Sequence, residues 1–487
     1  MNTAVDEAVK PQSIAYPEIR MLIGGEWRSR PGAPIVNPTT DEVLGTVPHA
    51  TRADLEDAVA AAASGFQAWR KTSPLKRSEI LLRAAALLRE RIETIATTMV
   101  LEQGKLLRDA RLEVLRAASI TEWDAQEARR TYGRVIPSEV GMRHIVLREP
   151  IGVVAAFSPW NAPVGSPVRK VAGALAAGCS IILKAAEETP AGAMQLCQAF
   201  VDAGVPAGVL NLVFGDPAQI SGFLIPHAEV RLVAFTGSVP VGKRLAAMAG
   251  QYMKPAIMEL GGHGPVIVCD DADPVAVAAL AVRAKIRNAG QLCIAATRFL
   301  VADSIYDRFA AELARLAGAL RLGDPMDPET ELGPVANHRR VQALESLIAD
   351  ASDSGAELLA GGPRIGNVGC FLPLTVLGNV PDHARAMTEE PFGPLALLQR
   401  FHTVDEAIAK ANQLQVGLNA YVFTDSSRLA DRFMRDIETG YLSINHFGSS
   451  VAETPFGGVK DSGYAREGGT EGIEQYTIAR TVSHKTG

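Results

Sequence analysis

Cysteines are few in this chain and lie far apart. The 487 residues include five of them, Cys179, Cys197, Cys269, Cys293 and Cys370. An odd, scattered set argues against a disulfide framework and against a cluster of zinc ligands. No apolar run reaches membrane-spanning length, and the polar N-terminal residues lack the apolar core of a signal peptide. The sequence therefore predicts a protein of the reducing cytoplasm that binds neither a metal nor a membrane.

A strong charge of either sign is also absent. The net charge is −6 at pH 7, with 21% charged and 47% hydrophobic residues. This balance is typical of a globular enzyme and gives no basic excess for nucleic acid. The length exceeds one ordinary core and predicts about two to four structural units. We expect a small molecule as the partner.

Residue patterning indicates an α/β fold. Residues 21–48 alternate apolar and polar positions, as short strands do, and 52–127 have the periodicity of long amphipathic helices. The Arg and Glu residues of 76–130 are expected on solvated helix faces. From Ile151 to about residue 445, two series of apolar runs alternate with Ala-rich helical stretches. Such strands predict parallel sheets covered on both faces.

Cys293 is a candidate nucleophile. It lies in RNAGQLCIA, a Gly-containing loop after a predicted helix. The thiolate is the reactive form, and a helix end or a cation can favour it. A single cysteine is more often a small buried hydrophobe, as we expect for the other four. The interpretation of Cys293 as a nucleophile therefore depends on the other motifs of the sequence.

Two polar residues could complete such a site. Glu259 lies in MELGGHGP, and a carboxylate in an apolar pocket has a raised pKa and can accept a proton from water. Asn161 follows an apolar strand in FSPWNAPV, where α/β sheets bind ligands, and its amide can hydrogen-bond a developing alkoxide. Taken alone, each could also be an ordinary turn residue.

Two further segments suit a dinucleotide. Lys184 and Glu187 lie in IILKAAEETP, after an apolar strand. Glu187 could accept from both ribose hydroxyls and would repel a 2′-phosphate, which favours NAD over NADP. Gly237 and Ser238, in FTGSVPVG, begin a predicted helix whose N-terminus suits a pyrophosphate. The pattern lacks the G-x-G-x-x-G fingerprint and is weak alone.

The motifs together resemble those of the aldehyde dehydrogenase superfamily over nearly the whole chain. They are, in the family's order, SPWN, KAAEETP, FTGS, MELGG, GQLC, EEPFGP and PFGGVKDSG. Glu259 and Cys293 are 34 positions apart, as the family's base and nucleophile typically are. Ala185 and Ala465 depart from the usual motifs, and we expect consequences for packing only.

The resemblance implies a fold with three parts. They are a Rossmann-like NAD-binding domain (1–130 and 150–257), an α/β catalytic domain (258–450), and an oligomerisation β-arm (131–149 with 473–487), with 451–472 returning to the NAD-binding domain. The arm implies a homo-oligomer, either a dimer or a tetramer.

The resemblance also implies roles for individual residues. Cys293 attacks the aldehyde, Asn161 and the Cys293 N–H hold the oxyanion, and Glu259 activates the water that hydrolyses the thioester. The cofactor-binding residues it implies are Trp160, Lys184, Glu187, Gly237, Ser238, Leu260, Glu390 and Phe392.

Four residues indicate the substrate. Arg169, Arg287, Ser449 and Ser450 resemble the positions at which succinate-semialdehyde dehydrogenases bind a distal carboxylate. Paired guanidinium groups can hold such an anion. The expected substrate is succinate semialdehyde, with 2-oxoglutarate semialdehyde, glutarate semialdehyde and sulfolactaldehyde as alternatives. Ala295 replaces the second cysteine with which some members form a regulatory disulfide.

Two other classes are weighed against this interpretation. A CoA-acylating enzyme typically lacks a glutamate at the position of Glu259. A catalytically silent NAD-binding relative would lack Cys293, Glu259 or Asn161, and all three are present.

Overall fold

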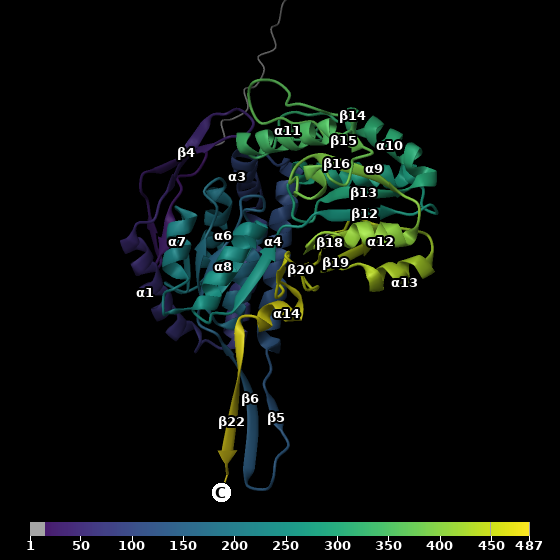
Figure 1. The fold of residues 1–487 in the computed structure, drawn as a ribbon. Helices are drawn as coiled ribbons and strands as arrows, with labels where there is room; N and C mark the ends of the chain where they lie inside the picture. Colours follow the sequence, from purple (N-terminus) through teal and green to yellow (C-terminus); the bar gives the residue numbers. More distant parts are fainter. Residues whose placement is uncertain (1–14, 449, 487) are drawn as a thin grey trace, which may run out of the picture.

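Two α/β lobes lie side by side, and a long β-arm projects from one of them (Figure 1). The computed structural model describes residues 15–448 and 450–486. Ser449, one of the expected substrate contacts, lies outside the described residues. Within them, no helix has both the length and the apolarity to cross a membrane.

The first lobe is built on an eight-stranded sheet in the order β2-β1-β9-β8-β7-β10-β11-β21. Its strands are β1 (Met21–Ile23), β2 (Glu26–Arg28), β7 (Val153–Phe157), β8 (Ser180–Lys184), β9 (Leu210–Val213), β10 (Val230–Gly237), β11 (Ala256–Leu260) and β21 (Gly463–Tyr464). The five strands from β9 to β11 are parallel, and the chain order reverses between β7 and β10. This reversal is the Rossmann-like switch point, at which ligands bind beyond the carboxyl ends of the strands.

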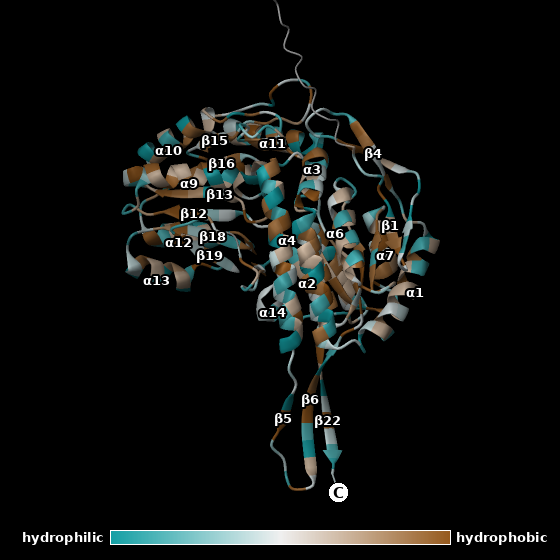
Figure 2. Cartoon of the chain, turned by 180° about the vertical axis from the view of Figure 1, so that it is seen from behind, coloured by the Kyte–Doolittle hydropathy of each residue, from teal (hydrophilic) through white to brown (hydrophobic). Residues whose placement is uncertain are grey.

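Helices cover both faces of this sheet, as its continuous apolar strands require. They are α1 (Arg52–Trp69), α2 (Pro74–Glu90), α3 (Ile92–Gln103), α4 (Leu107–Glu127), α5 (Gly165–Ala177), α6 (Pro190–Ala203), α7 (Pro217–Leu224), α8 (Val239–Gln251) and α14 (Gly469–Glu474). Helix α4 packs on α5 and α2, and Figure 2 shows that it carries both hydrophilic and hydrophobic residues. Helix α6 begins at Pro190 and ends before Gly204, whose φ of 106° suits glycine.

The second lobe has a seven-stranded sheet in the order β14-β15-β16-β13-β12-β18-β19, with only β14 antiparallel. Its strands are β12 (Gly264–Val268), β13 (Ala296–Ala302), β14 (Glu357–Ala360), β15 (Thr375–Gly378), β16 (Leu395–Phe401), β18 (Asn419–Phe423) and β19 (Tyr441–Ile444). The helices around it are α9 (Pro274–Ile286), α10 (Asp303–Gly318), α11 (His338–Asp353), α12 (Val404–Asn412) and α13 (Ser427–Asp436).

The arm joins β5 (Arg134–Ile136), β6 (Met142–Pro150) and β22 (Thr477–Lys485) in one antiparallel sheet. The remaining short elements are β3 (Gly32–Val36), β4 (Val43–Pro48), β17 (Val416–Gly417), β20 (Val459–Lys460) and the 3₁₀ turns η1 (Ala128–Arg130), η2 (Arg287–Gly290) and η3 (Arg385–Met387). The expected domain boundary at 257/258 falls inside β11, because this strand pairs with β10 and keeps Glu259 in the first sheet.

Candidate active site

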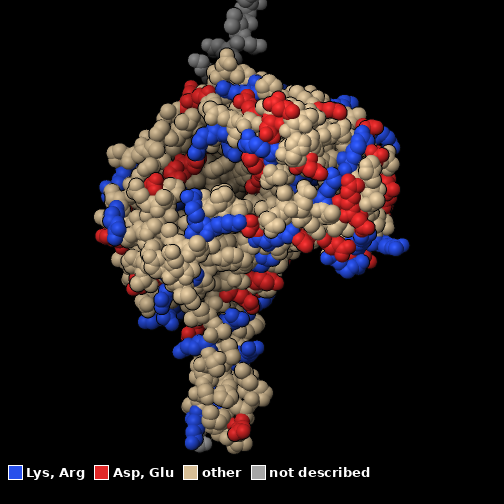
Figure 3. All heavy atoms as spheres, viewed as in Figure 1, with Lys and Arg blue, Asp and Glu red and all other residues tan. Residues whose placement is uncertain are grey.

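A cavity of about 770 Å³ lies where the two lobes meet. Figure 3 shows one face of the molecule hollowed between the lobes, with Lys and Arg side chains on the rim. The cavity brings together most of the residues singled out in the sequence: Trp160, Asn161, Arg169, Gly237, Ser238, Glu259, Leu260, Arg287, Cys293, Glu390, Phe392 and Ser450. They converge because the parallel strands of the first sheet end at this junction and the loop before β13 enters it from the second.

The Cys293 loop is held in an unusual backbone conformation. Asn288 and Ala289, both in η2, have φ values of 48° and 50°, in the left-handed region that L-residues rarely adopt. The Asn288 side chain donates to the backbone oxygens of Asn161 (3.0 Å) and Gln291 (3.1 Å). The Gln291 side chain donates to Asn288 O (3.0 Å) and accepts from Ala336 N (2.9 Å). These buried hydrogen bonds fix the approach to Cys293.

The Cys293 thiol is protonated in this environment. Desolvation raises its pKa to about 12, and the negative charges of Glu259 and Glu390 also raise it. Arg169 acts in the opposite direction but does not outweigh them. The expectation that a cation or helix end favours the thiolate therefore does not describe this state, and attack on an aldehyde requires a base.

Asn161 is buried beside this loop. Its Nδ2 donates to Gln291 O (3.0 Å), and its backbone oxygen accepts from Lys105 Nζ (3.1 Å). An amide nitrogen carries two N–H groups, so the second can serve an oxygen near Cys293. The carboxylate of Glu113 pairs with Lys105 and accepts from the backbone N–H groups of Val164 (3.0 Å) and Gly165 (2.9 Å).

Glu259 lies at the end of β11 and is 2% exposed. Among the described residues, nothing hydrogen-bonds its Oε1. Burial raises the pKa of Glu259 well above its usual value, the charge of Glu467 raises it further, and Lys170 and Arg169 lower it. A carboxylic group in this condition can exchange a proton with water at moderate pH.

A buried ion pair that sequence reasoning missed lies near Glu259. Lys170 Nζ, on α5, donates to Glu467 Oε1 (2.7 Å) and to Thr236 Oγ1 (2.6 Å). Lys170 is 0% exposed and Glu467 3%. Nothing in the sequence indicates a partner 297 positions away. The two members of the pair act on Glu259 in opposite directions, since Glu467 raises its pKa and Lys170 lowers it.

The residues expected at the adenosine ribose lie at the carboxyl end of β8. Lys184 Nζ pairs with Glu187 Oε1 (2.5 Å), which also accepts from Gly215 N (3.1 Å). Neither residue lines the cavity itself. Ser238 is the N-cap of α8, and its side chain makes no capping bond. The N-terminus of α8 thus keeps donors available for an anion.

Glu390 and Phe392 approach from the second lobe. Burial raises the Glu390 pKa to about 8, and its Oε1 accepts from Gly262 N (3.4 Å). A side chain at Gly261 would displace the Glu390 carboxylate from its present position. The Phe392 ring meets Trp160 edge-on, with centroids 5.5 Å apart.

Two guanidinium groups face the cavity. Arg169 Nη2 donates to Ser450 Oγ (3.2 Å), while its buried Nη1 has no hydrogen-bond partner in the described part of the chain. Arg287 lines the same cavity from η2. No described carboxylate forms an ion pair within 4.0 Å with either. Glu113 and Arg116 of α4 also line the cavity, which corrects the expectation that charged residues of 76–130 lie only on solvated faces.

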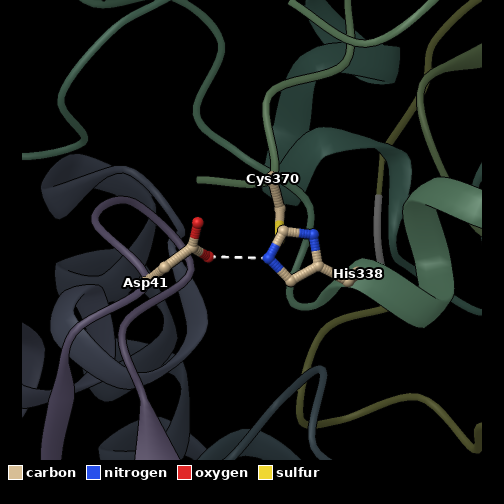
Figure 4. A group of neighbouring side chains, drawn as sticks. All are labelled: Asp41, His338 and Cys370. Carbon is tan, nitrogen blue, oxygen red and sulfur yellow. Dashed lines mark hydrogen bonds and ion pairs between the residues drawn. The ribbon is translucent and has the colours of Figure 1, made fainter. Parts of the chain in front are cut away.

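A separate cluster joins the lobes outside the cavity (Figure 4). Asp41, His338 and Cys370 place ligand-type atoms within 4.8 Å of one another. His338 Nε2 pairs with Asp41 Oδ1 (2.7 Å), and Gly369 N donates to Asp41 Oδ2 (2.8 Å). Cys370 N donates to Pro38 O (2.8 Å). These bonds fasten the β3–β4 turn to the second lobe.

Comparisons with known proteins agree with the fold and the motifs. The family model "Aldehyde dehydrogenase family" matches residues 27–482. The chain is 46% identical to a putative 4-(hydroxymethyl)benzenesulfonate dehydrogenase of Comamonas testosteroni, over 95% of this chain and 98% of that one. It is 42% identical to a 3-sulfolactaldehyde dehydrogenase of Pseudomonas putida, over 95% and 96%.

A comparison with solved structures also supports the family. The succinate-semialdehyde dehydrogenase of Burkholderia pseudomallei superimposes with a TM-score of 0.95 at 38% identity, covering 97% of this chain and 99% of that one. The chain therefore belongs to the aldehyde dehydrogenase family, whose members oxidise aldehydes with NAD(P).

Proposed function

We propose that this enzyme uses Cys293 and NAD to oxidise an aldehyde that carries a distal anionic group. The observation that carries the proposal is the pair Arg169 and Arg287, which line the cavity of Cys293 without a described carboxylate partner. Both residues are half-buried, and guanidinium groups partly removed from water without an anion are costly, so a bound carboxylate or sulfonate satisfies them. Succinate semialdehyde is the carboxylate expected from the sequence, and relatives named for sulfonated substrates support the sulfonate.

The first half of the reaction makes a thioester. The Cys293 thiol gives its proton to a water molecule, and Sγ bonds to the aldehyde carbon while the carbonyl electron pair moves to oxygen. The second N–H of Asn161 Nδ2 and the Cys293 backbone N–H hold this oxyanion. The oxyanion then re-forms the carbonyl as hydride leaves the carbon, and a thioester on Cys293 results.

The second half releases the acid. Glu259 accepts a proton from water, and the water oxygen attacks the thioester carbon. The C–S bond breaks, the carboxylic acid leaves, and the Cys293 sulfur regains a proton. Hydrolysis needs a base that activates water, and Glu259 can be that base. Its presence supports hydrolysis of the thioester over transfer of the acyl group to CoA. The convergence of Cys293, Glu259 and Asn161 in one cavity also disfavours a catalytically silent relative.

The residues present suit a dinucleotide. The N-terminus of α8 at Ser238 would hold the pyrophosphate, Lys184 and Glu187 the adenosine ribose, and Glu390 the nicotinamide ribose. Trp160, Leu260 and Phe392 would line the cofactor cleft. When bound, the nicotinamide supplies the hydride acceptor. Glu187 supports NAD, because a 2′-phosphate beside its carboxylate would meet a like charge.

A substrate panel tests the anionic-substrate proposal. We expect kcat/KM for succinate semialdehyde to exceed that for butanal, which has the same chain length and no charge. Because a hydrogen bond to a charged group contributes about 1.5–3 kcal/mol, Arg169→Ala and Arg287→Ala should each lower efficiency on the anion about 10- to 100-fold. Butanal is the internal control, and kcat/KM for it should change little in either variant. A preference for butanal that neither variant alters would overturn the proposal.

The arm is proposed as the homo-oligomer contact. Val135 is 71% exposed and Val140 105%, an unusual position for β-branched residues in a strand and its turn. Strands β5 and β22 are the two edges of the arm sheet, and the backbone of β5 can therefore meet another copy.

A further inference from the structure

A third arginine lines the cavity from an element that supplies no other anion contact. Arg116 lies on α4 beside Leu112, which is 50% exposed, and Arg116 is itself exposed. These two residues therefore mark the mouth of the cavity. Desolvation lowers the pKa of the Arg116 guanidinium, and the charges of Arg287 and Arg169 also lower it, whereas Glu113 and Asp109 raise it without outweighing the others. Arg116 therefore lies close enough to Arg287 and Arg169 to be affected by their charges, and all three line the same cavity.

The acidic residues of this wall already have partners. Glu113 pairs with Lys105 and accepts two backbone N–H groups. Asp109 accepts from Asn288 N (3.3 Å). Within residues 15–448 and 450–486, Arg116 forms no ion pair and no hydrogen bond. By contrast Arg111, on the same helix, is paired through both Nε and Nη2 with the Glu93 carboxylate.

We propose that Arg116, Arg169 and Arg287 form a three-sided anion subsite that selects a sulfonate over a carboxylate. A carboxylate is planar, and two guanidinium groups can satisfy its two oxygens. A sulfonate has three equivalent oxygens in a tetrahedral arrangement, so a third donor must approach from another direction. The three arginines lie on α4, α5 and η2, which are separate elements around one cavity. This inference rests on the proposed function and names the anion that the site prefers.

Arg116 is the residue that makes the difference between the two anions. Arg169 is fixed by Ser450 and by the Phe456 ring, which lies 5.2 Å from its Cζ. It can therefore hold one oxygen from the inner side. Arg116 stands at the open side. The lone pairs of a carboxylate lie in the plane of its two oxygens, whereas a sulfonate presents a third oxygen outside such a plane to a donor that approaches from this side.

A matched pair of substrates tests this subsite. Succinate semialdehyde and 3-sulfopropanal have the same two-carbon spacer and the same single charge, so long-range attraction cancels from their ratio. We expect the wild-type enzyme to favour the sulfonate. Arg116→Gln should lower kcat/KM for the sulfonate at least about tenfold, the value of one charged hydrogen bond, and alter that for the carboxylate less than about threefold. Arg111→Gln, which removes an arginine from the same helix away from the cavity, should leave the ratio unchanged.

The outcomes separate this inference from the proposed function. A loss in Arg116→Gln that is equal for both anions, or no loss, overturns the three-sided subsite while the anionic-substrate proposal stands. If the wild-type enzyme oxidises butanal as efficiently as either anion, the proposed function itself fails. A fall in the sulfonate-to-carboxylate ratio with unchanged butanal oxidation supports the subsite, because a folding defect would lower all three activities together.

Discussion

Removal of Lys170 should destabilise the protein far more than removal of an exposed lysine with an equally short ion pair. Lys170 and Glu467 are 0% and 3% exposed at 2.7 Å, whereas Lys243 and Asp461 are 58% and 36% exposed at 2.6 Å. A buried charge left without its partner costs about 3–5 kcal/mol. An exposed pair contributes about 0–1 kcal/mol. The two pairs are thus matched in distance and differ chiefly in burial, although Lys170 also donates to Thr236 Oγ1.

Urea unfolding measures the difference. Lys170→Met should lower the free energy of unfolding by about 3–5 kcal/mol, and Lys243→Met by less than about 1 kcal/mol. The double variant Lys170→Met, Glu467→Gln should regain part of the loss, because it no longer buries an unpaired carboxylate. Equal effects of the two single variants would refute the reasoning from burial.

Substitutions of Lys170 and Glu467 should shift the pH dependence of kcat in opposite directions. Glu467 raises the pKa of Glu259 and Lys170 lowers it. A base must be ionised to accept a proton from water, so the rate of thioester hydrolysis rises with pH through this pKa. Lys170→Met should move the low-pH limb of kcat to higher pH, and Glu467→Gln should move it to lower pH. Shifts in the same direction would show that the charges do not act on Glu259 as described.

Three further outcomes are expected. Iodoacetamide should alkylate Cys293 slowly at pH 7 and faster as pH rises, because the thiol pKa is about 12, and Glu259→Gln should accelerate the reaction at neutral pH. Mass spectrometry measures the rate of Cys293 alkylation. An alkylation rate in the wild-type enzyme that is already maximal below pH 8 would contradict the prediction. Glu187→Ala should raise the ratio of NADP to NAD efficiency in steady-state assays, and an unchanged ratio would remove Glu187 from cofactor selection. Val135→Glu on the arm should shift the mass measured by light scattering toward a smaller species, and an unchanged mass would place the contact elsewhere.

Much of this site could be predicted because its residues belong to short local motifs. Asn161, Gly237 and Glu259 each follow or end an apolar strand, and parallel strands bring their carboxyl ends to one edge. The structure brings Cys293, Glu259 and Asn161 to one cavity, and their roles as nucleophile, base and oxyanion donor stay predictions.

The parts that escaped prediction depend on contacts between distant segments. The Lys170–Glu467 pair joins α5 to the loop before α14, and a charged residue in a helix gives no sign of which neighbour it meets. Arg116 lies in an Arg- and Glu-rich stretch that is typical of a solvated face, and only the packing of α4 at the lobe junction brings it to the cavity. The raised pKa of Cys293 likewise follows from its burial and from the carboxylates of Glu259 and Glu390, which the fold places near it.

Mass spectrometry of the Glu259→Gln enzyme tests the central claim most directly. With succinate semialdehyde and NAD, this variant should form NADH in a single turnover and retain the substrate's acyl group as a thioester on the peptide that contains Cys293. The wild-type enzyme should release the acid, and Cys293→Ser should form neither adduct nor NADH. Continued turnover in Glu259→Gln without an adduct, or an acyl group on a different residue, would contradict the assignment of Cys293 as nucleophile and Glu259 as base.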